Sequence, residues 1–104
     1  MSKLFVIFCK DKPDSLDLRM TNRPAHLEFA RGFGERLKLA GPILTEKEGS
    51  PCGSLVVIEG ESVEEVEGLL KQDPYCKAGL FQSTEVRPWL PVAGDWLPGE
   101  ERQL

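Results

Sequence analysis

The stretch KLFVIFCK, residues 3–10, decides how the rest of the chain is interpreted. Branched and aromatic side chains stand at both its odd and its even positions. Because alternate residues of a strand point to opposite faces, this pattern predicts a strand that is buried on both faces. The stretch SLVVIEG, residues 54–60, has the same pattern and predicts a second strand of this kind.

The chain between these strands begins with DKPDSLDLRMTNRP, residues 11–24, which is rich in Asp and Pro and predicts a loop over the surface. Asn22 is then suited to cap a helix, with Pro24 inside its first turn. Apolar residues recur at helical spacing from there to about Leu39. The first helix is therefore expected to run from Asn22 to Leu39.

The remaining elements complete the order. Residues 40–54 open with a Gly-Pro break and contain a short strand followed by a turn. Residues 62–72 predict a helix capped by Ser62, and residues 81–90 predict a more polar last strand that Pro88 stops. The order β-α-β-β-α-β predicts an α+β, ferredoxin-like fold, a four-stranded antiparallel sheet with two helices on one face.

Two helices cover only one face of such a sheet, yet both central strands are apolar on both faces. Leaving the second face in water costs about 25 cal/mol for each Å² of apolar surface. We therefore expect a second copy of the sheet to cover it, which gives a sheet-to-sheet homodimer, a dimeric α/β barrel.

The composition is that of one globular domain: the chain has 104 residues, of which 40% are hydrophobic and 29% charged. The net charge of −4 without a basic block argues against nucleic-acid binding. Three cysteines without a CxxC pair argue against a disulfide framework and for a reducing compartment. No apolar run is long enough for a membrane span, so a cytoplasmic location is expected. Residues 1–90 are predicted to form the domain, and residues 91–104 an irregular C-terminal tail.

The chemistry-bearing residues form no strong motif. The phosphate-binding glycine loop, GxSxG, HExxH and zinc-type spacings are all missing from the sequence, and we expect neither a metal nor a cofactor. The single histidine, His26, shares the apolar side of the first helix with Ala30 and Phe33. Two interpretations stay open: an inert histidine at the rim of the core, or a general acid or base, since an imidazole moves protons near neutral pH.

Asp73 has a similar ambiguity. It precedes Pro74 and is suited to cap a short helical turn, which is the simpler interpretation. In the predicted fold, however, the start of the first helix and the segment after the second lie at the same end of the sheet. His26 and Asp73 can then meet, and the carboxylate would orient the ring. Cys76 is interpreted as a small buried apolar residue.

These residues resemble the YciI-like family, which is related to the dimeric α/β-barrel superfamily. The resemblance rests on a set of short motifs in the expected order over about the first ninety residues: LFVIFCKDKPDS, RPAHL, AGP, GSLVVIE, DPY, AGLF and VRPW. It implies a ferredoxin-like fold, sheet-to-sheet homodimers and a histidine–aspartate active site formed by His26 and Asp73. Ser54 and Tyr75 would line the pocket.

One branch of that family is similar to a dehydrochlorinase, and related barrels include lactone isomerases. The resemblance favours a small lyase or isomerase that uses His26 and Asp73 for proton transfer on a small cyclic or aromatic oxygenated substrate. Arg23 and Ser54 would hold the oxygens of that substrate. The alternative is a binding or accessory module that uses the same pocket without chemistry. Trp89 and Trp96 fit ordinary packing better than an anchor for a partner.

Overall fold

The computed structural model describes residues 3–96, which form one antiparallel sheet and a layer of helices. The strands are β1 (Lys3–Asp11), β2 (Leu37–Leu44), β3 (Pro51–Gly60) and β4 (Phe81–Trp89). The helices are α1 (Leu16–Arg31), α2 (Val63–Lys71) and the short α3 (Pro74–Lys77), with a 3₁₀ turn, η1 (Gly34–Arg36), before β2. Apart from α3 and η1, the order is β-α-β-β-α-β, which confirms the predicted ferredoxin-like fold.

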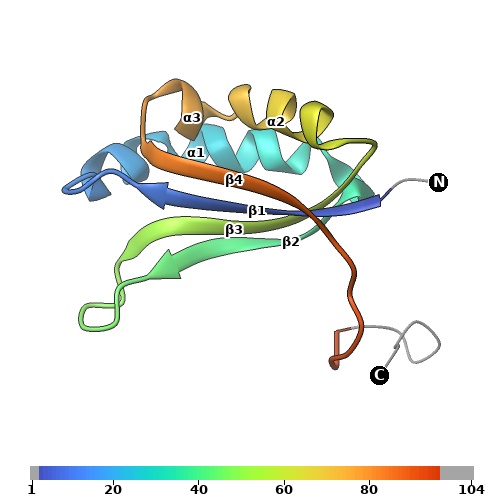
Figure 1. The fold of residues 1–104 in the computed structure, drawn as a ribbon. Coiled ribbons are helices and arrows are strands. Elements are labelled where there is room, and N and C mark those ends of the chain that lie inside the picture. Colours follow the sequence, from blue (N-terminus) through green and yellow to red (C-terminus); the bar gives the residue numbers. More distant parts are fainter. Residues whose placement is uncertain (1–2, 97–104) are drawn as a thin grey trace.

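The sheet has the order β2-β3-β1-β4, so the two strands that are apolar on both faces occupy its centre. All three helices lie on one face of the sheet (Figure 1). Phe5 pairs with Ile58 and Ile7 pairs with Val56 across the two central strands. These side chains point toward the helices and belong to the core, whose buried members are Phe5, Ile7, Cys9, Ile58, Val66, Leu70 and Val86.

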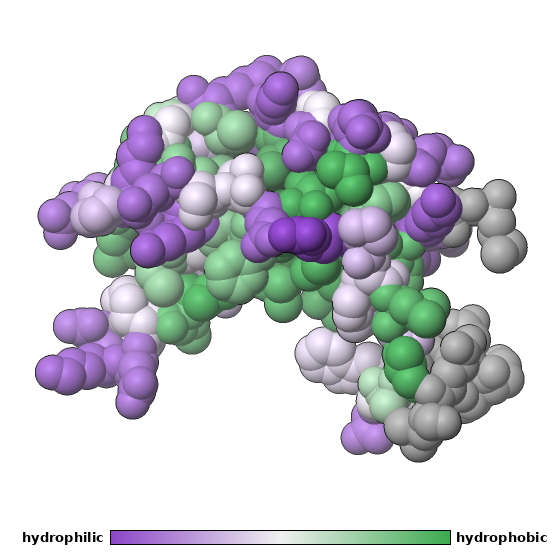
Figure 2. Space-filling model, in the orientation of Figure 1, coloured by the Kyte–Doolittle hydropathy of each residue, from purple (hydrophilic) through white to green (hydrophobic). Residues whose placement is uncertain are grey.

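The opposite face of the sheet carries apolar side chains that no helix covers. Val6 pairs with Val57 and Phe8 with Leu55 on this face. Phe8 is 50% exposed and Leu55 is 36% exposed. Figure 2 shows apolar surface gathered under the sheet, between the polar β2–β3 hairpin and the segment that follows β4. A second copy of the chain on this face remains a prediction.

The predicted bounds of the first helix are wrong at both ends. Helix α1 starts at Leu16, so Pro24 lies in its middle and Asn22 directs its side-chain amide back to the carbonyl oxygen of Leu18. A proline inside a helix removes one backbone hydrogen bond, which is why a helix start was expected there. The helix also ends at Arg31, because the chain must turn through η1 to enter β2.

Two prolines lie inside strands that were expected to stop at them or to begin after them. Pro42 stands within β2 and Pro88 within β4. Both strands are at the edges of the sheet, where a missing N–H costs little because one side of the strand has no partner.

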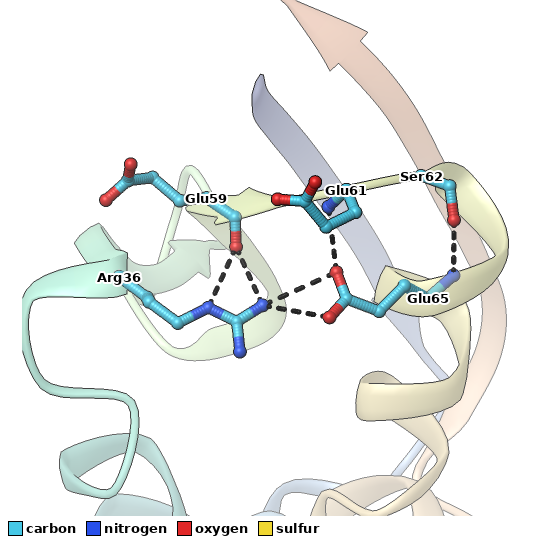
Figure 3. A network of polar contacts seen from close by, with 5 residues as sticks. All are labelled: Arg36, Glu59, Glu61, Ser62 and Glu65. Atoms are coloured by element: carbon cyan, nitrogen blue, oxygen red, sulfur yellow. Dashed lines mark hydrogen bonds and ion pairs between the residues drawn. The ribbon is translucent and has the colours of Figure 1, made fainter. Parts of the chain in front are cut away.

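The predicted Ser62 cap is present, and it is part of a larger polar network (Figure 3). The Ser62 hydroxyl accepts a hydrogen bond from the backbone N–H of Glu65, and the Glu65 carboxylate accepts one from the N–H of Glu61 at 2.8 Å. This is a variant of the capping box. Arg36 joins it to the strand layer, donating to the carbonyl oxygen of Glu59 and to the Glu65 carboxylate. The network fixes where α2 begins.

Beyond β4, residues 91–96 form neither helix nor strand. The rest of the predicted tail, 97–104, lies outside the described residues. Within the described part of the chain, each helix is too short or too polar to cross a membrane.

The close approach of β3 to β1 gives a test of this packing. A Cβ atom on Gly53 would overlap the carbonyl oxygen of Cys9, whereas one on Gly68, on the exposed side of α2, would meet nothing within 4 Å. Gly53→Ala should lower the free energy of unfolding by about 1–3 kcal/mol through overpacking. Gly68→Ala should raise it by about 0.5–1 kcal/mol, since alanine favours a helix. Urea denaturation measures both, and equal effects would contradict the described register.

Candidate active site

Asp73 is fixed by the local structure of α3. Its backbone is extended, Pro74 follows at the first helical position, and its carboxylate accepts a hydrogen bond from the N–H of Tyr75 at 2.9 Å. The helix ends at Lys77, and the chain then turns away through Gly79, whose φ of 76° is a conformation that glycine adopts easily. The sequence DPYCKAG therefore forms one capped turn, as the simpler interpretation of Asp73 predicted.

His26 reaches the same carboxylate from α1. Its Nδ1 lies 2.9 Å from Oδ1 and 3.0 Å from Oδ2 of Asp73. The side chains are 18% and 10% exposed, so water competes little for this contact. His26 stands in the third turn of α1 because the helix starts at Leu16, and the contact forms because α3 packs against α1. Asp73 thus both caps α3 and binds His26.

The contact determines which nitrogen of His26 is available for chemistry. A carboxylate beside Nδ1 favours the tautomer in which Nδ1 carries the proton and donates it to Asp73. The second nitrogen, Nε2, then has a free lone pair. A neutral imidazole held in this way accepts a proton at Nε2, and the carboxylate stabilises the resulting cation.

Tyr75 forms the floor beside His26. The two rings are stacked, with centroids 3.9 Å apart and an angle of 12° between their planes. The guanidinium carbon of Arg19 lies 4.7 Å from the centroid of the same Tyr75 ring. Burial raises the pKa of Tyr75, although the charges of Arg19 and Arg23 oppose this. The phenol therefore keeps its proton at neutral pH and remains a hydrogen-bond donor.

A second buried pair lies next to Tyr75. Arg19 donates two hydrogen bonds to the Asp11 carboxylate, at 2.7 Å from Nε and 3.0 Å from Nη2. Its Nη2 also donates to the Ser54 hydroxyl at 2.8 Å. Burial disfavours the charged guanidinium, but Asp11 outweighs this effect, and the net result is a raised pKa for Arg19. The pair links the end of β1, the first turn of α1 and the middle of β3.

Arg19, together with the ring residues His26 and Tyr75, borders a cavity of about 600 Å³ between α1 and the β2–β3 side of the sheet. Of the residues expected to form the site, His26, Arg23, Ser54 and Tyr75 line this cavity. Asp73 does not line it, but lies behind His26 and borders a smaller, mostly apolar space of about 50 Å³. The structure thus brings all five residues together, four at the cavity and one in support of the histidine.

Sequence reasoning missed Asp11 and Arg19. Both fall in the segment expected to be a surface loop, where a carboxylate and an arginine are ordinary solvated groups. The signal that identifies them is the helical spacing of Leu16, Met20 and Leu27, which extends the helix to Ser15 once a proline is allowed within it.

The cysteines have no evident part in this chemistry. Cys9 is 1% exposed. Burial, followed by the charge of Asp73, raises the pKa of its thiol to about 12. It is therefore a thiol rather than a reactive thiolate at neutral pH. Cys76, expected to be buried, is partly exposed. Within residues 3–96, no three His, Cys, Asp or Glu side chains come together as a metal site would need.

The Asp11–Arg19 pair gives a prediction of stability. Asp11→Asn leaves a buried guanidinium without its counter-charge and should lower the free energy of unfolding by about 3–5 kcal/mol. Glu28→Gln breaks an ion pair to Arg31 whose side chains are 79% and 69% exposed, and should change it by less than about 0.5 kcal/mol. Thermal or urea unfolding compares the two; a small effect of Asp11→Asn would mean that the pair does not hold the site together.

Comparison with known proteins places this geometry in context. The chain is 36% identical over 96 residues to Protein YciI of Escherichia coli O6:H1, an alignment that covers 86% of this chain and 98% of that protein. It is 30% identical over 95 residues to an uncharacterized protein of Haemophilus influenzae, covering 85% and 97% of the two chains.

A solved structure is also similar. The chain is 37% identical to the 5-chloro-2-hydroxyhydroquinone dehydrochlorinase TftG of Burkholderia phenoliruptrix, with a TM-score of 0.80. The match covers 85% of this chain and 94% of that one, whose structure is a complex with 2,5-dihydroxybenzoquinone. The model of the YCII-related domain matches residues 3–90. The chain therefore belongs to the YCII-related domain family.

Proposed function

We propose that the protein is a small lyase or isomerase that moves a proton on a cyclic oxygenated substrate, with His26 as the acid–base group. The observation that carries the proposal is the 2.9 Å contact between Nδ1 of His26 and Asp73, which leaves Nε2 free at a cavity wall. Proton transfer of this kind requires no cofactor.

A dehydrochlorination shows how the residues would act. Nε2 of His26 takes the proton of a ring hydroxyl and returns it to the ring carbon that bears chlorine, which gives the keto tautomer. Nε2 then removes a second hydroxyl proton, a new C=O bond forms, and chloride leaves with the electron pair of the C–Cl bond. The substrate loses one proton and one chloride ion. Asp73 stabilises the imidazolium in each step.

The other residues would bind the oxygens of the substrate. The Ser54 hydroxyl and the Arg23 guanidinium are donors at the cavity, and the Tyr75 phenol is a third. TftG supports the assignment, because it shares the fold and 37% of the aligned residues with this chain and is named for a dehydrochlorination.

The active form would be a sheet-to-sheet homodimer. The uncovered face carries Val6, Phe8 and Leu55, and a second copy of the same face is the surface of matching shape and chemistry. This assembly would leave the helix layer, and with it the cavity, accessible.

Substitution of the acid–base pair tests the chemistry. With 5-chloro-2-hydroxyhydroquinone as the probe, His26→Ala should lower the rate of chloride release by about 10²–10⁴-fold, because the proton acceptor is lost. Asp73→Asn should lower it as well, since the amide no longer favours the proton on Nδ1. Glu67→Gln, which removes an exposed carboxylate on α2, should keep the full rate. If His26→Ala keeps the parent rate, or the parent releases no chloride, the assignment is wrong and a binding module is favoured.

Substitution on the open face tests the dimer. Phe8→Glu places a charge in the centre of the predicted interface and should shift the protein from dimer to monomer in sedimentation velocity. Leu18→Glu, at a residue 37% exposed on α1, should leave the dimer unchanged. A parent protein that sediments as a monomer at micromolar concentration would contradict the proposed assembly.

A further inference from the structure

The cavity beside His26 has a charge opposite to that of the whole chain. The chain has a net charge of −4, yet the described residues that line the cavity include Arg19, Arg23, Arg31 and His26 and no carboxylate. Charges that line a concave site act on its contents more strongly than charges on an open surface, because less water screens them.

Among the described residues, two of these three arginines have a carboxylate partner and the third has none. Arg19 is held by the Asp11 carboxylate, and Arg31 is paired with Glu28 at 3.1 Å. Within residues 3–96, Arg23 makes no hydrogen bond and no ion pair. Arg23 itself lines the cavity, and its charge opposes the rise that burial causes in the pKa of Tyr75. Arg23 therefore supplies positive charge that the fold itself does not use.

The polar groups at the cavity are also nearly all donors. The Ser54 oxygen already accepts a hydrogen bond from Arg19, so its own proton is free for another acceptor. Arg23 only donates, and the protonated phenol of Tyr75 can donate as well. The exception is Nε2 of His26, which is an acceptor because Nδ1 carries the ring proton and donates a hydrogen bond to Asp73. The polar side chains that line the cavity thus offer several donors and one acceptor.

The remaining walls are apolar. Leu27 and Ala30 from α1 face Ala40 and Pro42 from β2, and Val56 from β3. The volume of about 600 Å³ lies in the range of ordinary small-molecule sites. A single ring with oxygen substituents fits these walls, with its edge toward the donors.

We infer that the cavity selects a small cyclic oxyanion, a compound whose oxygens accept from Ser54, Tyr75 and Arg23 while at most one acidic proton faces His26. Enolates, phenolates and hydroxyquinone anions belong to this class, and neutral ethers of the same rings do not. The inference rests on the proposed function only in that both use one cavity. It concerns binding and does not depend on turnover.

Isothermal titration calorimetry with two probes tests it. 2,5-Dihydroxybenzoquinone is ionised at neutral pH, and in 2,5-dimethoxybenzoquinone methyl groups replace the acidic protons. We expect the anion to bind at least tenfold more tightly to the parent protein, and this preference to shrink as salt is added. Equal affinity for the two probes overturns the inference.

Two arginine variants distinguish a direct contact between Arg23 and the anion from the overall positive charge of the cavity. Arg23→Gln, at an exposed residue whose loss should not affect folding, should weaken binding of the anion at least tenfold and leave the neutral probe within twofold. Arg31→Gln removes a compensated charge from the same cavity and should change either affinity by less than twofold. Equal effects of the two substitutions on the anion also overturn the inference.

The His26→Ala protein distinguishes this inference from the proposed function. If it binds the anion in an Arg23-dependent manner while the parent shows no turnover, the inference stands and the catalytic proposal fails. If the parent turns over its substrate but Arg23→Gln leaves binding of the anion unchanged, the reverse holds.

Discussion

The carboxylate of Asp73 joins two parts of the molecule that the sequence keeps far apart. One of its oxygens accepts the N–H that begins α3, and both lie within hydrogen-bond distance of the His26 ring in α1. Without this carboxylate α3 loses its cap, and the ring of His26 loses the partner that sets its orientation. Because the stacked Tyr75 belongs to α3, its position against His26 depends on the same interaction.

The Asp11–Arg19 pair, which also lies next to the Tyr75 ring, has a comparable role. A buried ion pair of this kind contributes little net stability, because desolvation offsets the attraction between the charges. The pair matters because it positions its neighbours. Arg19 donates a hydrogen bond to the Ser54 hydroxyl and holds a positive charge over the Tyr75 ring. In both pairs a carboxylate orients a cationic or basic group. The described residues that line the cavity include no carboxylate.

The fold was predictable where local patterns carry the information. Strands β1 and β3 carry apolar residues on both faces because they are central, and the Ser62 cap marks a real helix start. The start of α1 was not, since the cost of Pro24 within a helix is outweighed by tertiary packing that local rules do not include.

The site was predictable in part for a similar reason. His26 and Asp73 are 47 residues apart, and no periodicity reports that they touch. The predicted topology allowed the two residues to meet and the resemblance to a family favoured the pair, whereas Asp11 and Arg19 had no such guide. Asp11 ends a strand and Arg19 lies in the first turn of a helix. Their contact can be predicted only if the helix is known to begin at Leu16.

The prolines at the two edges of the sheet have a consequence for behaviour in a crowded solution. Pro42 and Pro88 each leave an edge strand without one N–H, so neither edge offers an unbroken ladder to an added strand. A partly unfolded neighbour cannot extend this sheet easily, and growth toward fibrils is discouraged at both ends. The molecule can then expose an apolar sheet face for specific association, while its edge strands resist the addition of further strands.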